Sequence, residues 1–167
     1  MSCTLLFFLP TFLTDRVSVL THDYKDMPVD KTSTASKLYI RVYYEDTDAG
    51  GIVFYANYLK FFERARTEWL RSLGINQSHM ASSTGQVFVV KEVEIQYRKP
   101  AGLDDLLCIQ STITHIGAAS VTFHQTASLN EELLCESTIQ VVCVDAATLR
   151  PAKFNPDLRL SLEKAQD

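Results

Sequence analysis

The sequence predicts an α+β domain in which one long amphipathic helix packs against a strongly curved antiparallel sheet. Three observations support this prediction. Residues 57–74 carry the clearest helical periodicity in the chain, a strand-like segment precedes them, and four strand-like segments follow them. Short connections between most of the strands favour antiparallel neighbours. A length of 167 residues suits one domain of this kind.

The first strand is expected over residues 37–45, where β-branched and aromatic residues alternate in part with polar ones. The polar residues 22–36 precede it and include Pro28. We therefore expect a flexible N-terminal extension over residues 1–36 and a folded domain over residues 37–160.

The N-terminal residues indicate neither export nor a membrane span. Leu5–Leu13 is apolar but far shorter than the roughly 20 residues that cross a bilayer. No Lys or Arg precedes it, as a signal peptide would require. We expect a cytoplasmic protein, and we hypothesise that translation starts at Met27. Mass spectrometry of native protein beginning at Met1 would rule out that start.

The helix has an apolar face and two predicted ends. Its apolar residues fall three or four positions apart and are Tyr58, Phe61, Phe62, Ala65, Trp69 and Leu73. Asn57 suits the N-cap, and Gly74 suits the C-terminal stop.

Four strands are expected after the helix and a short irregular or helical segment, over residues 86–97, 106–116, 120–129 and 133–145. Turn-forming residues fill the connections 98–105, 117–119 and 130–132. Near the C-terminus, Asn155 and Pro156 suit the cap and first position of another helix.

Composition excludes several function classes. A net charge of −4 argues against a general nucleic-acid binder. Cys108, Cys135 and Cys143 lie in apolar strands without a CxxC pair, so we expect reduced core thiols. The histidines show no HxxxH spacing, and we expect no metal site.

The segment YYEDTDAGGIVFYANY, residues 43–58, is where we expect chemistry. It places Glu45, Asp46 and Asp48 before Gly50 and Gly51, directly ahead of the helix. Glycines let the backbone approach a ligand, and a helix N-terminus offers free N–H groups. A carboxylate beside such donors suits ester or thioester cleavage. A solvated surface turn is the alternative, and a divalent-cation site is a weaker one.

Residues 46–74, DTDAGGIVFYANYLKFFERARTEWLRSLG, closely resemble the signature of the hotdog acyl-CoA thioesterases. This family joins the 4-hydroxybenzoyl-CoA thioesterases and the Tol-Pal-associated acyl-CoA thioesterases. The resemblance covers residues 38 to about 155, and residues 88–105 and 141–151 favour the Tol-Pal-associated branch. It implies the hotdog fold, one long central helix wrapped by a curved five-stranded antiparallel sheet.

The resemblance also implies roles for residues of the loop. Asp48 matches the catalytic aspartate, the Tyr55 backbone amide matches the group that polarises the carbonyl, and Tyr44 matches a tyrosine linked to activity. The Tol-Pal-associated members usually carry histidine where this chain has Tyr55. An amide role survives that change, and a side-chain acid–base role does not. Asp48 would act as nucleophile or as general base on short-chain or aromatic acyl-CoA.

The same resemblance implies partners. Hotdog active sites form between subunits, so we expect a homodimer or homotetramer, with an acyl carrier protein as a possible partner. No separate cofactor is expected, because coenzyme A is part of the substrate. Arg98 and Lys99, and secondarily Arg150 and Lys153, are candidate contacts for its phosphates, alongside Gly50 and Gly51.

One further pair and two other functions complete the expectations. Glu63 and Arg66, three apart on the helix, are expected to form an intrahelical or interface ion pair. A hotdog dehydratase is one alternative, although its site needs a histidine and none lies within 30 residues after Asp48. The other is a non-catalytic module that binds acyl thioesters or an acyl carrier protein.

Overall fold

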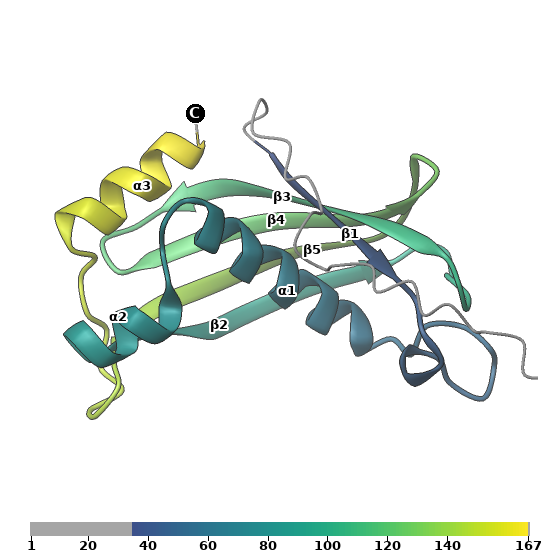
Figure 1. Cartoon of the computed structure of the whole chain (residues 1–167), viewed down its shortest axis with the longest axis horizontal. Coiled ribbons are helices and arrows are strands. Elements are labelled where there is room, and N and C mark those ends of the chain that lie inside the picture. Colours follow the sequence, from purple (N-terminus) through teal and green to yellow (C-terminus); the bar gives the residue numbers. More distant parts are fainter. Residues whose placement is uncertain (1–34, 167) are drawn as a thin grey trace, which may run out of the picture.

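The computed structural model describes residues 35–166 (Figure 1). The sequence-based expectations for Leu5–Leu13 and Met27 lie outside these residues. The elements in chain order are β1 (Ser36–Arg41), a 3₁₀ helix (Tyr44–Asp46), α1 (Asn57–Ser72), α2 (Gln77–Thr84), β2 (Gln86–Tyr97), β3 (Leu106–Ile116), β4 (Ser120–Leu129), β5 (Glu132–Asp145) and α3 (Pro156–Gln166).

The five strands form one sheet in the order β1-β3-β4-β5-β2. All four pairings are antiparallel. The tight connections 117–119 and 130–131 make β3, β4 and β5 sequential neighbours, as expected. The connection over residues 98–105 does not join neighbouring strands, because β2 pairs with β5 and β3 pairs with β1. The two edges of the sheet are therefore β1, which has six residues, and β2, which has 12.

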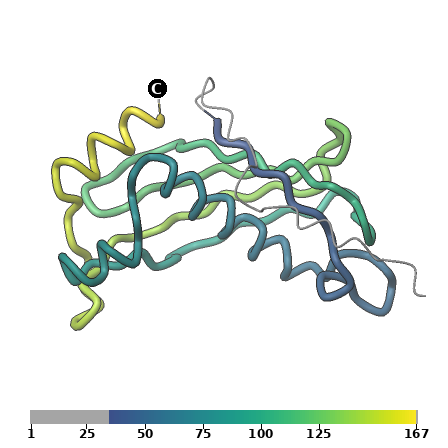
Figure 2. Tube along the Cα trace, viewed as in Figure 1, coloured from purple at the N-terminus to yellow at the C-terminus, as the bar shows by residue number. Residues whose placement is uncertain are grey.

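Helix α1 lies across one face of the sheet, as Figure 2 shows. Its predicted apolar face is the buried one, because Phe61, Phe62, Ala65 and Trp69 are all buried. Trp69 meets Phe123 of β4 edge to face, with ring centroids 6.0 Å apart. Burial of each large side chain contributes on the order of 2 kcal/mol before conformational entropy is counted.

The two ends of α1 differ in how well the sequence predicts them. Gly74 follows the helix with φ +83°, and the Ile75 amide donates to the Leu70 carbonyl at 2.9 Å, so the predicted stop is confirmed. The predicted N-cap is wrong. Ala56 occupies that position, and Asn57 is the first helical residue, with its side chain turned to the preceding loop.

Other local predictions are confirmed. The Asn155 side chain accepts a hydrogen bond from the Leu158 amide at 2.7 Å and so caps α3. Cys108, Cys135 and Cys143 are free thiols, and the last two are buried in the core. Within residues 35–166, no helix has both the length and the apolar character needed to cross a membrane.

Candidate active site

The loop between β1 and α1 folds into a small hairpin. Thr47 and Val53 form a β-bridge, and the Asp48 amide donates to the Ile52 carbonyl at 2.9 Å. The Gly51 amide returns to the Asp48 carbonyl at 3.0 Å, and Gly51 has φ +73°. The turn therefore needs a residue without a Cβ at position 51, which explains one of the two predicted glycines.

Asp46 fastens the base of this hairpin. Its side chain is buried, and Oδ2 accepts a hydrogen bond from the Tyr43 amide at 3.0 Å. Its carbonyl oxygen accepts from the Phe54 amide at 2.8 Å and from Asn57 Nδ2 at 2.9 Å. The first acid of the DxD pair and the first residue of α1 thus hold the loop against the helix start.

Asp48 is exposed at the turn of the hairpin. Its Oδ1 accepts a hydrogen bond from the Gly50 amide at 2.8 Å, while Oδ2 has no partner among the described residues. A Cβ built on Gly50 would lie 3.0 Å from Oδ1. A side chain at position 50 would therefore press on the carboxylate, which explains the second glycine.

Tyr55 lies where the loop enters α1. Its amide has no acceptor among residues 35–166, while its carbonyl oxygen accepts a hydrogen bond from the Tyr97 hydroxyl at 3.0 Å. Burial raises the pKa of Tyr97, so the hydroxyl stays protonated and can donate at neutral pH. The ring of Tyr55 is 63% exposed, and Tyr44, in the 3₁₀ helix, is 81% exposed.

The two basic residues after β2 have carboxylate partners. Arg98 Nε donates to Glu136 Oε1 at 3.0 Å, and Lys99 pairs with Glu132. Both cations are exposed and follow Tyr97 directly, which places them at the end of β2 that meets the start of α1. Their contact with coenzyme A remains a prediction, and it would require each cation to share or leave its carboxylate.

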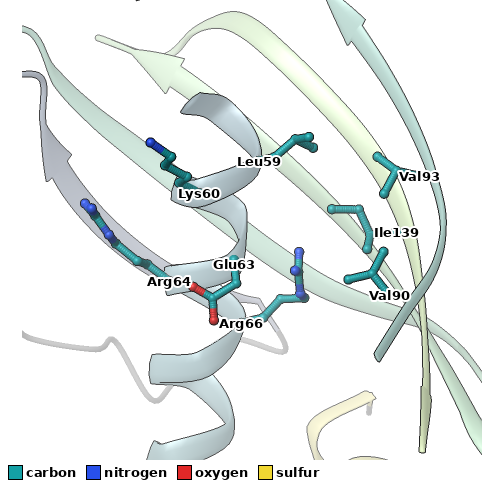
Figure 3. Close-up of a pocket in the computed structure, with 8 residues that line it drawn as sticks. All are labelled: Leu59, Lys60, Glu63, Arg64, Arg66, Val90, Val93 and Ile139. Carbon is teal, nitrogen blue, oxygen red and sulfur yellow. The ribbon is translucent and has the colours of Figure 1, made fainter. Parts of the chain in front are cut away.

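A cavity of about 550 Å³ opens between α1 and the sheet near β2 (Figure 3). Its apolar lining consists of Leu59, Val90, Val93 and Ile139, and Glu63 and Arg66 line it too. The predicted ion pair between Glu63 and Arg66 is absent within the described chain. Arg66 Nη1 instead donates to Gln125 Oε1 at 2.7 Å, and Glu63 accepts from the Thr67 hydroxyl at 2.7 Å.

Sequence reasoning missed the roles of Asp46, Asn57, Tyr97 and Gln125. Asp46 and Asp48 are equivalent in a linear pattern, and only burial separates them. A polar Gln125 within the alternating strand Ser120–Leu129 was the one available signal of a buried polar contact. The sequence carries no signal for the contact of Tyr97 with Tyr55, because the two residues lie 42 positions apart.

No cluster of three or more His, Cys, Asp or Glu side chains suited to a metal ion occurs in the described part of the chain. What this loop can do chemically is present a carboxylate with one unengaged oxygen, a free backbone amide at a helix start, and a nearby apolar cavity. These are the parts that acyl transfer requires.

Comparison with known proteins agrees with this chemistry. The chain is 42% identical over 120 residues to the acyl-CoA thioesterase YbgC of Haemophilus influenzae, covering 72% of this chain and 88% of that protein. It is 44% identical over 113 residues to the acyl-CoA thioester hydrolase YbgC of Escherichia coli O6:H1, covering 67% of this chain and 84% of that protein.

Solved structures share the fold. The crystal structure of a "probable thioesterase" from Bartonella henselae superposes with a TM-score of 0.68 at 34% identity, covering 71% of this chain and 98% of that one. The five-stranded antiparallel sheet and this structural similarity show the hotdog fold. The sequence profile of the thioesterase superfamily matches residues 50–136, and the chain belongs to that family.

Proposed function

We propose that this protein is an acyl-CoA thioester hydrolase that cleaves short-chain or aromatic acyl-CoA to the free acid and coenzyme A. The observation that supports this most directly is the Asp48 carboxylate, which sits on a hairpin fastened to the start of α1 and keeps one oxygen unengaged. The YbgC relatives, named as acyl-CoA thioesterases, support the same substrate class.

In the proposed reaction the thioester carbonyl oxygen accepts a hydrogen bond from the Tyr55 amide. The positive end of α1 stabilises the charge that this oxygen gains. Asp48 then attacks the carbonyl carbon, the C–S bond breaks, and coenzyme A leaves as the thiolate. Water hydrolyses the resulting mixed anhydride to free acid and the Asp48 carboxylate. Alternatively, Asp48 takes a proton from a water that attacks the carbonyl directly.

Asp48→Asn tests the proposal. The amide keeps the size of the side chain and an oxygen that can accept from the Gly50 amide, but it neither attacks a thioester nor accepts a proton from water. We expect thiol release from butyryl-CoA and 4-hydroxybenzoyl-CoA to fall at least about a hundredfold, with KM changed far less. Glu45→Gln, an exposed acid three residues earlier, is the matched control and should keep full activity. Full activity in Asp48→Asn, or acyl-CoA binding without hydrolysis by the wild type, would contradict this function.

The proposed assembly is a homodimer, or a tetramer of two such dimers, built on the open edge of β2. This strand is exposed along most of its length and carries exposed Val89, Val90 and Val93. An edge strand with exposed valines and unpaired backbone groups is suited to pairing with a second copy. The assembled site would then contain residues of both subunits near the α1 start.

A further inference from the structure

Arg66 is a buried cation without a carboxylate partner in the described chain. The residue is 7% exposed and lies on α1 facing the sheet. Its Nη1 donates to Gln125, which is fully buried and donates in turn to the Phe62 carbonyl at 3.0 Å and to Ser111 Oγ at 2.6 Å. This network of neutral groups holds the guanidinium in place without neutralising it.

Burial of this charge is costly and leaves it available to an anion. Desolvation lowers the pKa of Arg66 to about 10, so the guanidinium still carries its charge at neutral pH. Glu63 is close enough to oppose that shift but not to form an ion pair. A buried charge with only neutral hydrogen-bond partners is stabilised by any anion that can reach it.

The cavity between α1 and β2 gives such an anion a route. Figure 3 shows Arg66 extending from α1 toward Val90 and Ile139. Glu63 and Arg64 also line this cavity, and Arg64 extends from the other side of the helix. Arg66 also lines a second cavity of about 100 Å³ that continues toward Phe88 and Phe123. A guanidinium has five N–H donors and Gln125 accepts from one nitrogen, which leaves donors for a ligand in the cavity.

The same cavity begins at the first turn of α1, close in the chain to the proposed reaction centre. Leu59 and Lys60 of its lining belong to the first turn of α1, and Tyr55 lies just before that turn. An acyl group whose carbonyl reaches the Tyr55 amide can therefore extend along the apolar lining toward Arg66. A volume of about 550 Å³ is ample for a short acyl chain.

We propose that Arg66 is a specificity residue that binds a carboxylate at the far end of the acyl group. The preferred substrates are then the mono-coenzyme A thioesters of short dicarboxylic acids, with methylene groups against Leu59, Val90 and Val93. This inference rests on the proposed thioesterase function and names its substrate class. The guanidinium fork matches a carboxylate in two parallel hydrogen bonds, which neither a methyl end nor a phenyl end offers.

The test compares substrates matched in carbon number. Glutaryl-CoA is measured against pentanoyl-CoA, and adipyl-CoA against hexanoyl-CoA, by thiol release from the full-length protein. We expect kcat/KM to be at least roughly tenfold higher for one or both dicarboxylic substrates, the range of a charge-assisted hydrogen bond. Arg66→Met should abolish this ratio, and Arg66→Lys should reduce it while keeping the charge. Arg71→Met, at an exposed cation of α1 that lines neither of these two cavities, should retain the wild-type ratio.

A second readout separates this inference from the function it rests on. Glutarate should raise the melting temperature of the wild type and of Arg71→Met but not of Arg66→Met, and pentanoate should raise none of them. This measurement needs no turnover, and the wild-type result stands even if Arg66→Met does not fold.

Failure of the two proposals looks different. Hydrolysis of pentanoyl-CoA without a preference for glutaryl-CoA would overturn the role of Arg66 and leave the thioesterase function intact. No hydrolysis of any thioester would contradict the function, while glutarate binding would still decide the role of Arg66. An equal loss for both members of each pair in Arg66→Met, with glutarate binding kept, would assign Arg66 to the fold and overturn the inference.

Discussion

Asp46 and Asp48 lie only two positions apart, but the first side chain is buried and the second is exposed. Asp46 is 4% exposed, and its side chain and carbonyl together accept three hydrogen bonds that fasten the loop. Asp48 is exposed and accepts one hydrogen bond, from the Gly50 amide. The first acid therefore holds the hairpin in shape, and the second is the one free to react.

Replacing each acid with alanine separates these roles. Asp46→Ala removes the acceptor of the partly buried Tyr43 amide and should lower the free energy of unfolding by about 1–3 kcal/mol. Asp48→Ala removes only an exposed bond and should cost less than about 1 kcal/mol while abolishing hydrolysis. Urea unfolding at one fixed protein concentration measures both. Equal losses of stability would contradict the division.

Tyr97 is expected to act on the reaction through the backbone of Tyr55. Its hydroxyl holds the Tyr55 carbonyl at 3.0 Å, and this peptide group fixes the orientation of the turn into α1. Tyr97→Phe should lower kcat roughly fivefold with a smaller change in KM, because the Tyr55 amide, the proposed donor to the carbonyl oxygen, becomes less well positioned. Tyr39→Phe, on β1, is the control and should keep the wild-type kcat. A Tyr97→Phe variant with wild-type kcat and raised KM would place Tyr97 in substrate binding instead.

At the scale of elements, the sequence predicts what is locally encoded. The bounds of β2, β3 and β4 are reproduced exactly, because alternation of apolar residues ends where turn residues begin. The predicted end of β1 is wrong. The prediction extends it to residue 45, whereas it ends at Arg41, because Val42 forms its backbone hydrogen bonds with Asp104 and Asp105 of a distant loop. The pairing of β2 with β5 could not be predicted either, because the local residue pattern of a strand does not indicate which strand it pairs with.

The C-terminal stop of α1 gives an element-scale prediction. Gly74 has φ +83°, a conformation that costs a residue with a Cβ roughly 1 kcal/mol. Gly74→Ala should therefore lower the free energy of unfolding by about that amount, although open space surrounds the new methyl group. Gly102→Ala is the control, because its Cβ would make only ordinary contacts at 3.8 Å and 3.9 Å and its φ is not positive. Differential scanning calorimetry of both variants measures the difference, and equal melting temperatures would contradict it.

At the scale of the whole molecule, the sequence supplies parts of the site but not their assembly. Asp48, Gly50, Gly51 and the start of α1 are contiguous, so a motif of consecutive residues can indicate them. The contacts of Arg66 with Gln125 and of Tyr97 with Tyr55 join positions 59 and 42 residues apart. Those contacts exist only once the helix has packed on the sheet, which is why the expected intrahelical pairing of Arg66 with Glu63 is wrong.

Buried ionisable groups make the whole fold sensitive to alkali. Desolvation raises the pKa of the Cys135 thiol to about 12, and the neighbouring Glu136 adds to the shift. An unfolded cysteine ionises near 8.5, so this group stabilises the fold fully below about pH 8.5 and progressively less up to about pH 12. We expect stability to fall by up to about 1.4 kcal/mol per pH unit for this group between pH 9 and 11. Cys135→Ala should show a shallower slope over that range, and parallel slopes would refute this assignment.

The open edge of β2 predicts how copies of the chain assemble. This strand has 12 residues against the six of β1, so β2 offers the longer unpaired edge among residues 35–166, and Val89, which lies outside the cavity lining, is 37% exposed. A twofold pairing of two β2 edges would cover this apolar side chain and satisfy the backbone groups of the edge.

Val89→Lys tests this assembly because it places a charge on that edge outside the cavity. The proposed dimer or tetramer should shift toward smaller species, measured by light scattering after size-exclusion chromatography. Leu160→Lys, at an exposed apolar position on α3, should leave the mass unchanged. Because the proposed active site draws on both subunits, loss of the dimer should also lower turnover. A wild type that is monomeric and fully active at every concentration would refute both the assembly and the shared site.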